Sequence, residues 1–234
     1  MHTASTAALA TLIRNEVVHL ESVSRFAPSR RFASLFSDSS PSDSLYFLES
    51  GLVKLFKRGE DGKEIILRIV TAGELFGDQA LASDENRDVR GVSAEVMQEG
   101  VIHVIPRAAF LAWCESRPQV WRLLAETQIA RQRGMEKKVE LLCLQDVEYR
   151  ILYYLSELAG QVGTRTDGVQ DFAIPLSQSE LASLIGATRE TTSTTLNALA
   201  RRGLVKLGRR MLVVSSVDHV RNAASQRTVR AANG

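Results

Sequence analysis

The amino-acid sequence predicts an α+β protein in three consecutive parts, and three observations support this prediction. Short apolar runs between regularly spaced glycines fill the N-terminal half, which is typical of antiparallel strands. A long stretch without helix breakers follows, and two short amphipathic helices and an alternating segment come last. We therefore expect residues 1–115 to form a β-roll, residues 116–145 a long helix, and residues 146–234 a second domain.

Glycines at positions 51, 59, 62, 73, 77, 91 and 100 bound the expected strands of the N-terminal half. The best strand candidates are rich in Val, Ile, Leu and Phe: Leu45–Leu48, Leu52–Lys57, Glu64–Val70 and Val101–Ile105. The dipeptide Asp61-Gly62 predicts a hairpin turn, because Gly readily adopts positive φ. Residues 8–20 are expected to be weakly helical, and residues 28–43 to form a loop and an edge strand.

The long helix is expected to begin near Ser116, to tolerate Pro118 in its first turn, and to end near Leu144. Steps of three and four residues define a candidate seam: Val120, Leu123, Thr127, Ala130, Gly134, Lys137, Leu141 and Leu144. Such spacing is typical of two parallel helices that pack together, so the seam predicts a homodimer. Because Gly134 and Lys137 interrupt it, a helix packed only on its own chain is the alternative.

Residues 177–205 have the pattern of two short helices joined by a tight turn. Ser177 and Glu180 have the spacing of a capping box at the start of the first helix. Gly186 can adopt the positive φ that ends a helix, and Thr188 is a good N-cap for the second helix. Three residues of the first helix share one apolar face: Leu181, Leu184 and Ile185.

The second helix turns Leu196 and Leu199 toward the first and leaves polar side chains for solvent or a ligand: Arg189, Glu190, Ser193, Thr194 and Asn197. Helices linked in this way form a helix-turn-helix, whose second helix lies in the major groove of DNA. Arg189 fits guanine O6 and N7, and Glu190 can accept a hydrogen bond from cytosine N4. Phosphate contacts are expected from Thr188, Thr194, Thr195 and Asn197. The alternative is that Arg189 and Glu190 form an ordinary solvated pair.

Leu204–Val214 alternates apolar and polar residues and predicts a β-hairpin wing beside the second helix. Its positive charge comes from Lys206, Arg209 and Arg210. From residue 173 onward there are nine Lys and Arg against three Asp and Glu, whereas the whole chain has a formal net charge of +2. Positive charge therefore gathers where DNA phosphates would bind. Residues 225–234 lack apolar periodicity, so we expect a disordered tail.

Composition argues against several other classes of protein. No apolar stretch has the length of a membrane-spanning helix and the N-terminus lacks the basic region of a secretory signal, so we expect a cytoplasmic protein. Cys114 and Cys143 lie far apart and the four histidines are isolated, so no metal site is expected. No catalytic constellation of His, Cys or Ser stands out, which argues against an enzyme.

Three segments carry a resemblance to a known family: Tyr46–Leu55 (YFLESGLVKL), Gly73–Leu81 (GELFGDQAL) and Glu180–Thr191 (ELASLIGATRET). With the order of roll, long helix and winged helix-turn-helix, they resemble the cAMP receptor protein and FNR (Crp/Fnr) family of bacterial transcription regulators over residues 26–214. The resemblance implies a cyclic-nucleotide-binding-like roll that controls a homodimer on a palindromic promoter site in double-stranded DNA. RNA polymerase is a further expected partner.

The resemblance places a candidate effector pocket at Gly77, Asp78, Arg90, Met135 and Glu136. Members that bind cyclic nucleotides use a Gly-Glu turn, an Arg-Ser pair and, on the long helix, a Thr-Ser pair. Here Asp78 replaces the glutamate, Gly91 replaces the serine, and Met135 and Glu136 replace the Thr-Ser pair. These departures predict a small molecule or a nucleotide other than cAMP as effector; no cofactor is assigned, and a cAMP-responsive activator is the alternative. For Asp78 and Arg90 the alternative is a surface ion pair.

The sequence departs from the family pattern at two further places, which bear on the effector and on the bases that are read. No cysteine precedes residue 114, so the N-terminal cysteine cluster of FNR-type oxygen sensors is missing. Thr194 stands where the cAMP receptor protein has a third base-reading arginine. Arg189 and Glu190 are therefore expected to keep a G·C contact, and the outer base to be read differently.

Overall fold

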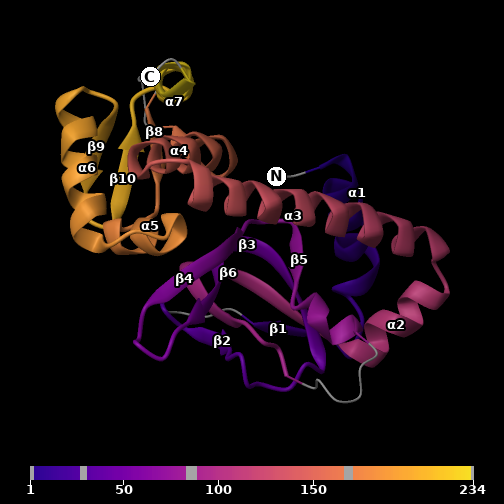
Figure 1. Ribbon diagram of the computed structural model, residues 1–234. Helices are drawn as coiled ribbons and strands as arrows, with labels where there is room; N and C mark the ends of the chain where they lie inside the picture. The colour runs from indigo at the N-terminus through magenta and orange to yellow at the C-terminus, as the bar shows by residue number, and fades with distance from the viewer. Residues whose placement is uncertain (1–2, 27–30, 83–88, 166–170, 233–234) are drawn as a thin grey trace. The chain divides into compact units, whose positions relative to one another are not determined.

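The structure is a computed structural model that describes residues 3–26, 31–82, 89–165 and 171–232 (Figure 1). The chain divides into two compact units, Met1–Lys57 with Leu67–Met135, and Arg58–Ile66 with Glu136–Gly234. The described residues form two separate sheets together with helices, so the α+β prediction is confirmed. No helix among the described residues is long and apolar enough to cross a membrane.

The first sheet has six strands: β1 (Ser24–Phe26), β2 (Ser34–Phe36), β3 (Ser44–Arg58), β4 (Glu64–Val70), β5 (Glu74–Phe76) and β6 (Ser93–Pro106). Its order is β1-β6-β3-β4, with β2 paired to β6 and β5 paired to β3. All four strand candidates lie in this sheet, but Leu45–Leu48 and Leu52–Lys57 belong to one strand, β3. The strand continues through Gly51, where the pairing with β6 is irregular, because glycine can adopt the φ of +95° found there. A larger residue would not fit, since its Cβ would lie 2.7 Å from the Gln98 carbonyl oxygen.

Short helices flank the roll: α1 (Ala4–Leu12), a π-helical turn (Ile13–Val17), a 3₁₀ turn (Asp78–Leu81) and α2 (Arg107–Glu115). The expected weak helix over residues 8–20 is thus a helix from Ala4 to Val17. Its apolar face, with Leu9, Ile13 and Val17, packs in one core with Phe47 and Phe110. Asp61-Gly62 forms the predicted turn, with Gly62 at φ +78°.

The long helix α3 (Pro118–Leu144) has nearly the predicted bounds, but its predicted seam is wrong in part. Val120, Thr127 and Leu141 are buried within the chain, so they cannot face a second copy. Leu144 of the predicted seam is exposed, and the other exposed large apolar side chains of the helix lie outside the seam: Trp121, Ile129, Met135 and Val139. The helical periodicity of the sequence is compatible with an apolar stripe on either face of α3, and only packing against the chain's own core decides which face is buried.

The second unit contains α4 (Val147–Val162), β7 (Thr164–Arg165), β8 (Phe172–Ile174), α5 (Gln178–Ile185), α6 (Arg189–Arg201), β9 (Val205–Gly208), β10 (Met211–Val214) and α7 (Val217–Ala232). Its antiparallel sheet has the order β7-β8-β10-β9, and α6 packs beside the β9–β10 hairpin (Figure 1). The prediction of a disordered tail over residues 225–234 is wrong as far as Ala232, because α7 continues to that residue. This helix packs against α4 and buries Val220 and Ala224.

Candidate nucleic-acid interface and effector site

The helix-turn-helix has the local structure that its sequence predicts. Ser177 and Glu180 form both bonds of the capping box: the Glu180 amide donates to Ser177 Oγ at 3.2 Å, and the Ser177 amide donates to Glu180 Oε2 at 2.7 Å. Gly186 ends α5 with a φ of +65°. Thr188 is the N-cap of α6, and its Oγ1 accepts a hydrogen bond from the Thr191 amide at 3.1 Å. These caps fix where α5 ends and where α6 begins.

The two faces of α6 have different environments. Leu196 and Leu199 are fully buried against the rest of the unit, as the apolar spacing predicts, and Thr192 is buried with them. The opposite face carries the predicted DNA-binding residues, all exposed except the half-buried Ser193: Arg189, Glu190, Ser193, Thr194 and Asn197. The N-terminal turn of α6 can therefore meet a ligand without any change in packing.

The hydroxyl groups of α6 are less available for phosphate than the sequence suggests. Thr195 Oγ1 donates to the Thr191 carbonyl oxygen at 2.8 Å. Thr188 Oγ1 lies 2.9 Å from Thr191 Oγ1 and also caps the helix. A phosphate oxygen needs a donor, so Thr194 and Asn197 are better placed to hold one than Thr188 and Thr195.

The predicted wing is the β9–β10 hairpin, in which Gly208 pairs with Met211. Arg209 and Arg210 are exposed in the two-residue turn, and Arg210 has a φ of +58°. Lys206, the third predicted cation, forms an ion pair with Asp171, with 2.6 Å between Nζ and Oδ2. The hairpin thus presents two arginines at its tip and a paired lysine on β9.

Two cations hold the C-terminal end of α5, where the last carbonyl groups of a helix lack partners of their own. Lys138 of α3 donates to the Leu184 carbonyl oxygen at 2.6 Å, and Arg150 of α4 donates to the Ile185 carbonyl oxygen at 2.7 Å. A cation is also favoured there by the helix dipole. The next residue, Gly186, is in close contact with α3, since a Cβ on it would lie 2.7 Å from a methyl group of Leu142. The turn before α6 is thus fixed from three sides.

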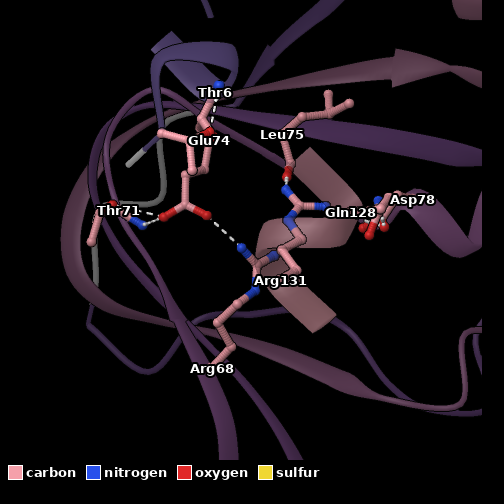
Figure 2. A network of polar contacts seen from close by, with 9 residues as sticks. Thr6, Arg68, Thr71, Glu74, Leu75, Asp78, Gln128 and Arg131 are labelled. Atoms are coloured by element: carbon pink, nitrogen blue, oxygen red, sulfur yellow. Dashed lines mark hydrogen bonds and ion pairs between the residues drawn. The ribbon is translucent and has the colours of Figure 1, made fainter. Parts of the chain in front are cut away.

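In the roll, Asp78 is bound by the long helix and not by Arg90. Arg131 of α3 lies 3.2 Å from the Asp78 carboxylate, and Gln128 donates a hydrogen bond to the same carboxylate (Figure 2). Burial alone would raise the pKa of Asp78, but the charges of Arg131 and Arg68 hold it below its ordinary value. The alternative of an Asp78–Arg90 surface pair is therefore wrong.

A second carboxylate, that of Glu74, lies beside the first, and both are half-buried. Glu74 forms an ion pair with Arg68 and accepts hydrogen bonds from the amide and hydroxyl of Thr71 at 3.0 and 2.7 Å. Figure 2 shows the guanidinium groups of Arg68 and Arg131 between the two carboxylates. Arg131 also donates to the Leu75 carbonyl oxygen. Sequence analysis missed Arg131, Gln128 and Arg68, because polar residues on a helix or strand carry no local signal of their partners.

Arg90 and Gly77 do come together, as the resemblance implies. The Arg90 side chain is buried and donates to the carbonyl oxygens of Ser44 at 2.8 Å and Gly77 at 3.4 Å. Its guanidinium carbon lies 4.4 Å from the ring centre of Phe36 and 5.0 Å from that of Tyr46. The other two predicted pocket residues, Met135 and Glu136, are exposed on α3.

A sheet roll, a long helix and a winged helix-turn-helix with an exposed Arg-Glu pair define a DNA-binding regulator with an N-terminal sensory domain. Family models agree: residues 30–117 match the cyclic nucleotide-binding domain, and residues 149–222 match the Crp-like helix-turn-helix domain. The chain is 30% identical over 190 residues to the CRP-like cAMP-activated global transcriptional regulator of Mycobacterium tuberculosis, covering 81% of this chain and 84% of that protein. The chain belongs to the Crp/Fnr family of transcription regulators.

Other relatives agree with this assignment. The Cyclic AMP receptor protein of Thermus thermophilus is 32% identical over 164 residues, which cover 70% of this chain and 71% of that protein. The crystal structure of a CRP-family transcriptional regulator from Thermus thermophilus has a TM-score of 0.73 at 26% identity, covering 86% of this chain and 96% of that one. FixK2 of Bradyrhizobium japonicum shares the fold, with a TM-score of 0.71 at 22% identity and the same coverage. The relative from Mycobacterium tuberculosis and the CRP-family structure from Thermus thermophilus are named as transcriptional regulators, and the family is one of regulators and not of enzymes, as the sequence predicts.

The Lys138 contact predicts a pH dependence of stability. Burial lowers the pKa of Lys138 from 10.5 to about 8. At a pH between these two pKa values, Lys138 is protonated in the unfolded chain and deprotonated in the folded chain. The free energy of unfolding should therefore rise with pH across this window, by about 1 to 3 kcal/mol relative to Lys138→Met. Urea unfolding of both proteins at pH 7.5 and pH 10.5 measures the difference. The neighbouring Lys137→Met variant is the control and should keep the wild-type profile; parallel profiles for wild type and Lys138→Met would contradict the prediction.

Proposed function

We propose that this protein binds a palindromic promoter site as a homodimer and reads each half-site with Arg189 and Glu190 of α6. The observation that carries the proposal is the exposure of both side chains in the first turn of a helix whose opposite face is buried. A guanidinium in that position can bind guanine O6 and N7 through two hydrogen bonds, and the carboxylate can accept one from cytosine N4. Symmetric half-sites follow from a two-fold dimer.

Phosphate contacts would fix the register of α6 in the groove. Thr194 and Asn197 on the exposed face can donate to phosphate oxygens, and the half-buried Ser193 lies beside them. The wing tip adds Arg209 and Arg210, with Lys206 on the same hairpin. Because the chain belongs to a family of transcription regulators, we expect it to act in the cytoplasm and to influence RNA polymerase bound near its site.

The dimer interface we propose is the exposed face of α3. Residues at steps of three and four run along this face: Trp121, Ala125, Ile129, Gln132, Glu136, Val139 and Cys143. This spacing is that of a parallel coiled-coil seam, and polar residues within such a seam favour one register. The exposed face thus replaces the buried face that the sequence first suggested.

We propose an effector other than cAMP. The carboxylate of Asp78 is occupied by Arg131 and Gln128, and Arg90 is occupied by two carbonyl oxygens beneath aromatic rings. Gly91 also lacks the hydroxyl that the resemblance would require. The second candidate is a cAMP-responsive activator, which the names of the relatives from Mycobacterium tuberculosis and Thermus thermophilus favour.

Thermal unfolding separates the two effector candidates. A ligand that binds only the folded state raises Tm with the logarithm of its concentration. We expect millimolar cAMP to leave Tm unchanged, and a screen of other cyclic mono- and dinucleotides and small metabolites to include the effector. A rise in Tm with cAMP that disappears in Arg90→Met would contradict the proposal and support the cAMP-responsive alternative.

Replacing Arg189 tests the reading of bases. Arg189→Ala should weaken binding to the selected site by about 1 to 3 kcal/mol and relax the preference at one guanine position, because the fork to O6 and N7 is lost. Selection from random duplexes followed by titration measures both effects. Arg201→Ala, which removes the same charge from the last turn of α6, is the control and should keep the selected motif. An unchanged motif for Arg189→Ala would refute the assignment.

Replacing Ile129 tests the interface. Ile129→Asp should convert the dimer to a monomer in light scattering and abolish tight binding to a palindromic site, because a charge would be buried in the seam. Gln119→Asp changes another exposed position of α3 and should leave the dimer intact. If Ile129→Asp remained dimeric, the copies would have to meet elsewhere.

A further inference from the structure

The Lys206–Asp171 pair crosses the outer face of the small sheet. Lys206 on β9 is opposite Val213 on β10, and Val213 is opposite Ala173 on β8. Residues directly opposite in antiparallel strands point to the same face, and so do residues two apart along a strand. Lys206 and Ala173 therefore share one face of the sheet, and Asp171 directly precedes β8. The lysine side chain reaches past the central strand to bring Nζ within 2.6 Å of Asp171 Oδ2.

The two partners differ in their exposure. The Asp171 side chain is 8% exposed, whereas the Lys206 side chain is 66% exposed. A carboxylate that has lost most of its water is costly unless it is paired, so Asp171 favours the paired position of the lysine. Lys206 itself, being largely solvated, can bind another anion if the carboxylate releases it. The opposite face of the sheet packs in the core through Val205, Leu212 and Val214.

We propose that Asp171 is an intramolecular competitor of DNA for Lys206. This inference rests on the proposed binding of DNA by the wing. With Lys206 held by Asp171, each wing contributes the two arginines of its tip, and one cation is withheld from the phosphates. Since phosphate contacts carry no sequence information, the competition lowers affinity for all DNA by the same factor and leaves the base preference of α6 unchanged. Asp171 thereby sets the overall affinity and its dependence on salt.

Neutralising the carboxylate tests this competition. In full-length Asp171→Asn, Lys206 is released, and affinity for both selected and random duplexes should rise about three- to tenfold at low salt. The slope of log affinity against log salt should steepen by about 0.9 for each wing that gains a phosphate contact. Asp218→Asn gives the same change in net charge at an exposed position of α7 and serves as the control, with at most a small, non-specific effect.

A double-mutant cycle assigns the effect to the pair. Lys206→Ala alone should change affinity and salt slope little, because the lysine is already held. In the Lys206→Ala background, Asp171→Asn should have no more effect than Asp218→Asn. Equal affinity and slope for Asp171→Asn and wild type would overturn the proposal. So would a loss of affinity with a shallower slope in Lys206→Ala, and this second result does not depend on the folding of Asp171→Asn. A wild-type protein that binds no DNA would instead refute the proposed function.

Discussion

The turn between α5 and α6 is the constraint on which DNA reading depends. Gly186 reverses the chain with a positive φ that other residues rarely adopt, and a Cβ on it would require a methyl group of Leu142 to move. Lys138 and Arg150 bind the last two carbonyl oxygens of α5. Because α3 and α4 both contact this turn, the direction in which α6 leaves it is fixed. The residues of α6 that we propose to read bases, Arg189 and Glu190, are then exposed and take no part in packing.

Ion pairs between side chains of different elements also stabilise the roll. Asp78 and Glu74 are carboxylates of one short segment, and each is paired with an arginine from a different element. Burial of a charged group is tolerated here because each carboxylate also accepts hydrogen bonds. Arg131 thus binds α3 to the segment that holds Asp78, which the resemblance assigns to the effector pocket. An effector that needs the Asp78 carboxylate must replace contacts that are already made.

The wing illustrates how a charge counted from sequence differs from a charge available to a partner. Lys206, Arg209 and Arg210 lie on one hairpin and contribute equally to the net charge of the C-terminal region. Their surroundings are unequal, since Lys206 is held by a nearly buried carboxylate whereas the two arginines are exposed at the tip. Electrostatic steering of DNA depends on the sum of all charges, whereas close contact with phosphate depends on each group and its competitors.

The sequence by itself determined the features that depend on near neighbours. The capping box of Ser177, the positive φ of Gly186 and the inward face of α6 follow from residues within one or two helical turns, so local sequence is enough to locate the recognition helix. Tertiary structure alone decided which face of α3 is buried, that Asp78 meets Arg131, that Lys206 meets Asp171, and that α7 extends to Ala232. These features depend on contacts between residues far apart in the chain. Helical periodicity and charge count constrain such contacts but cannot choose between partners.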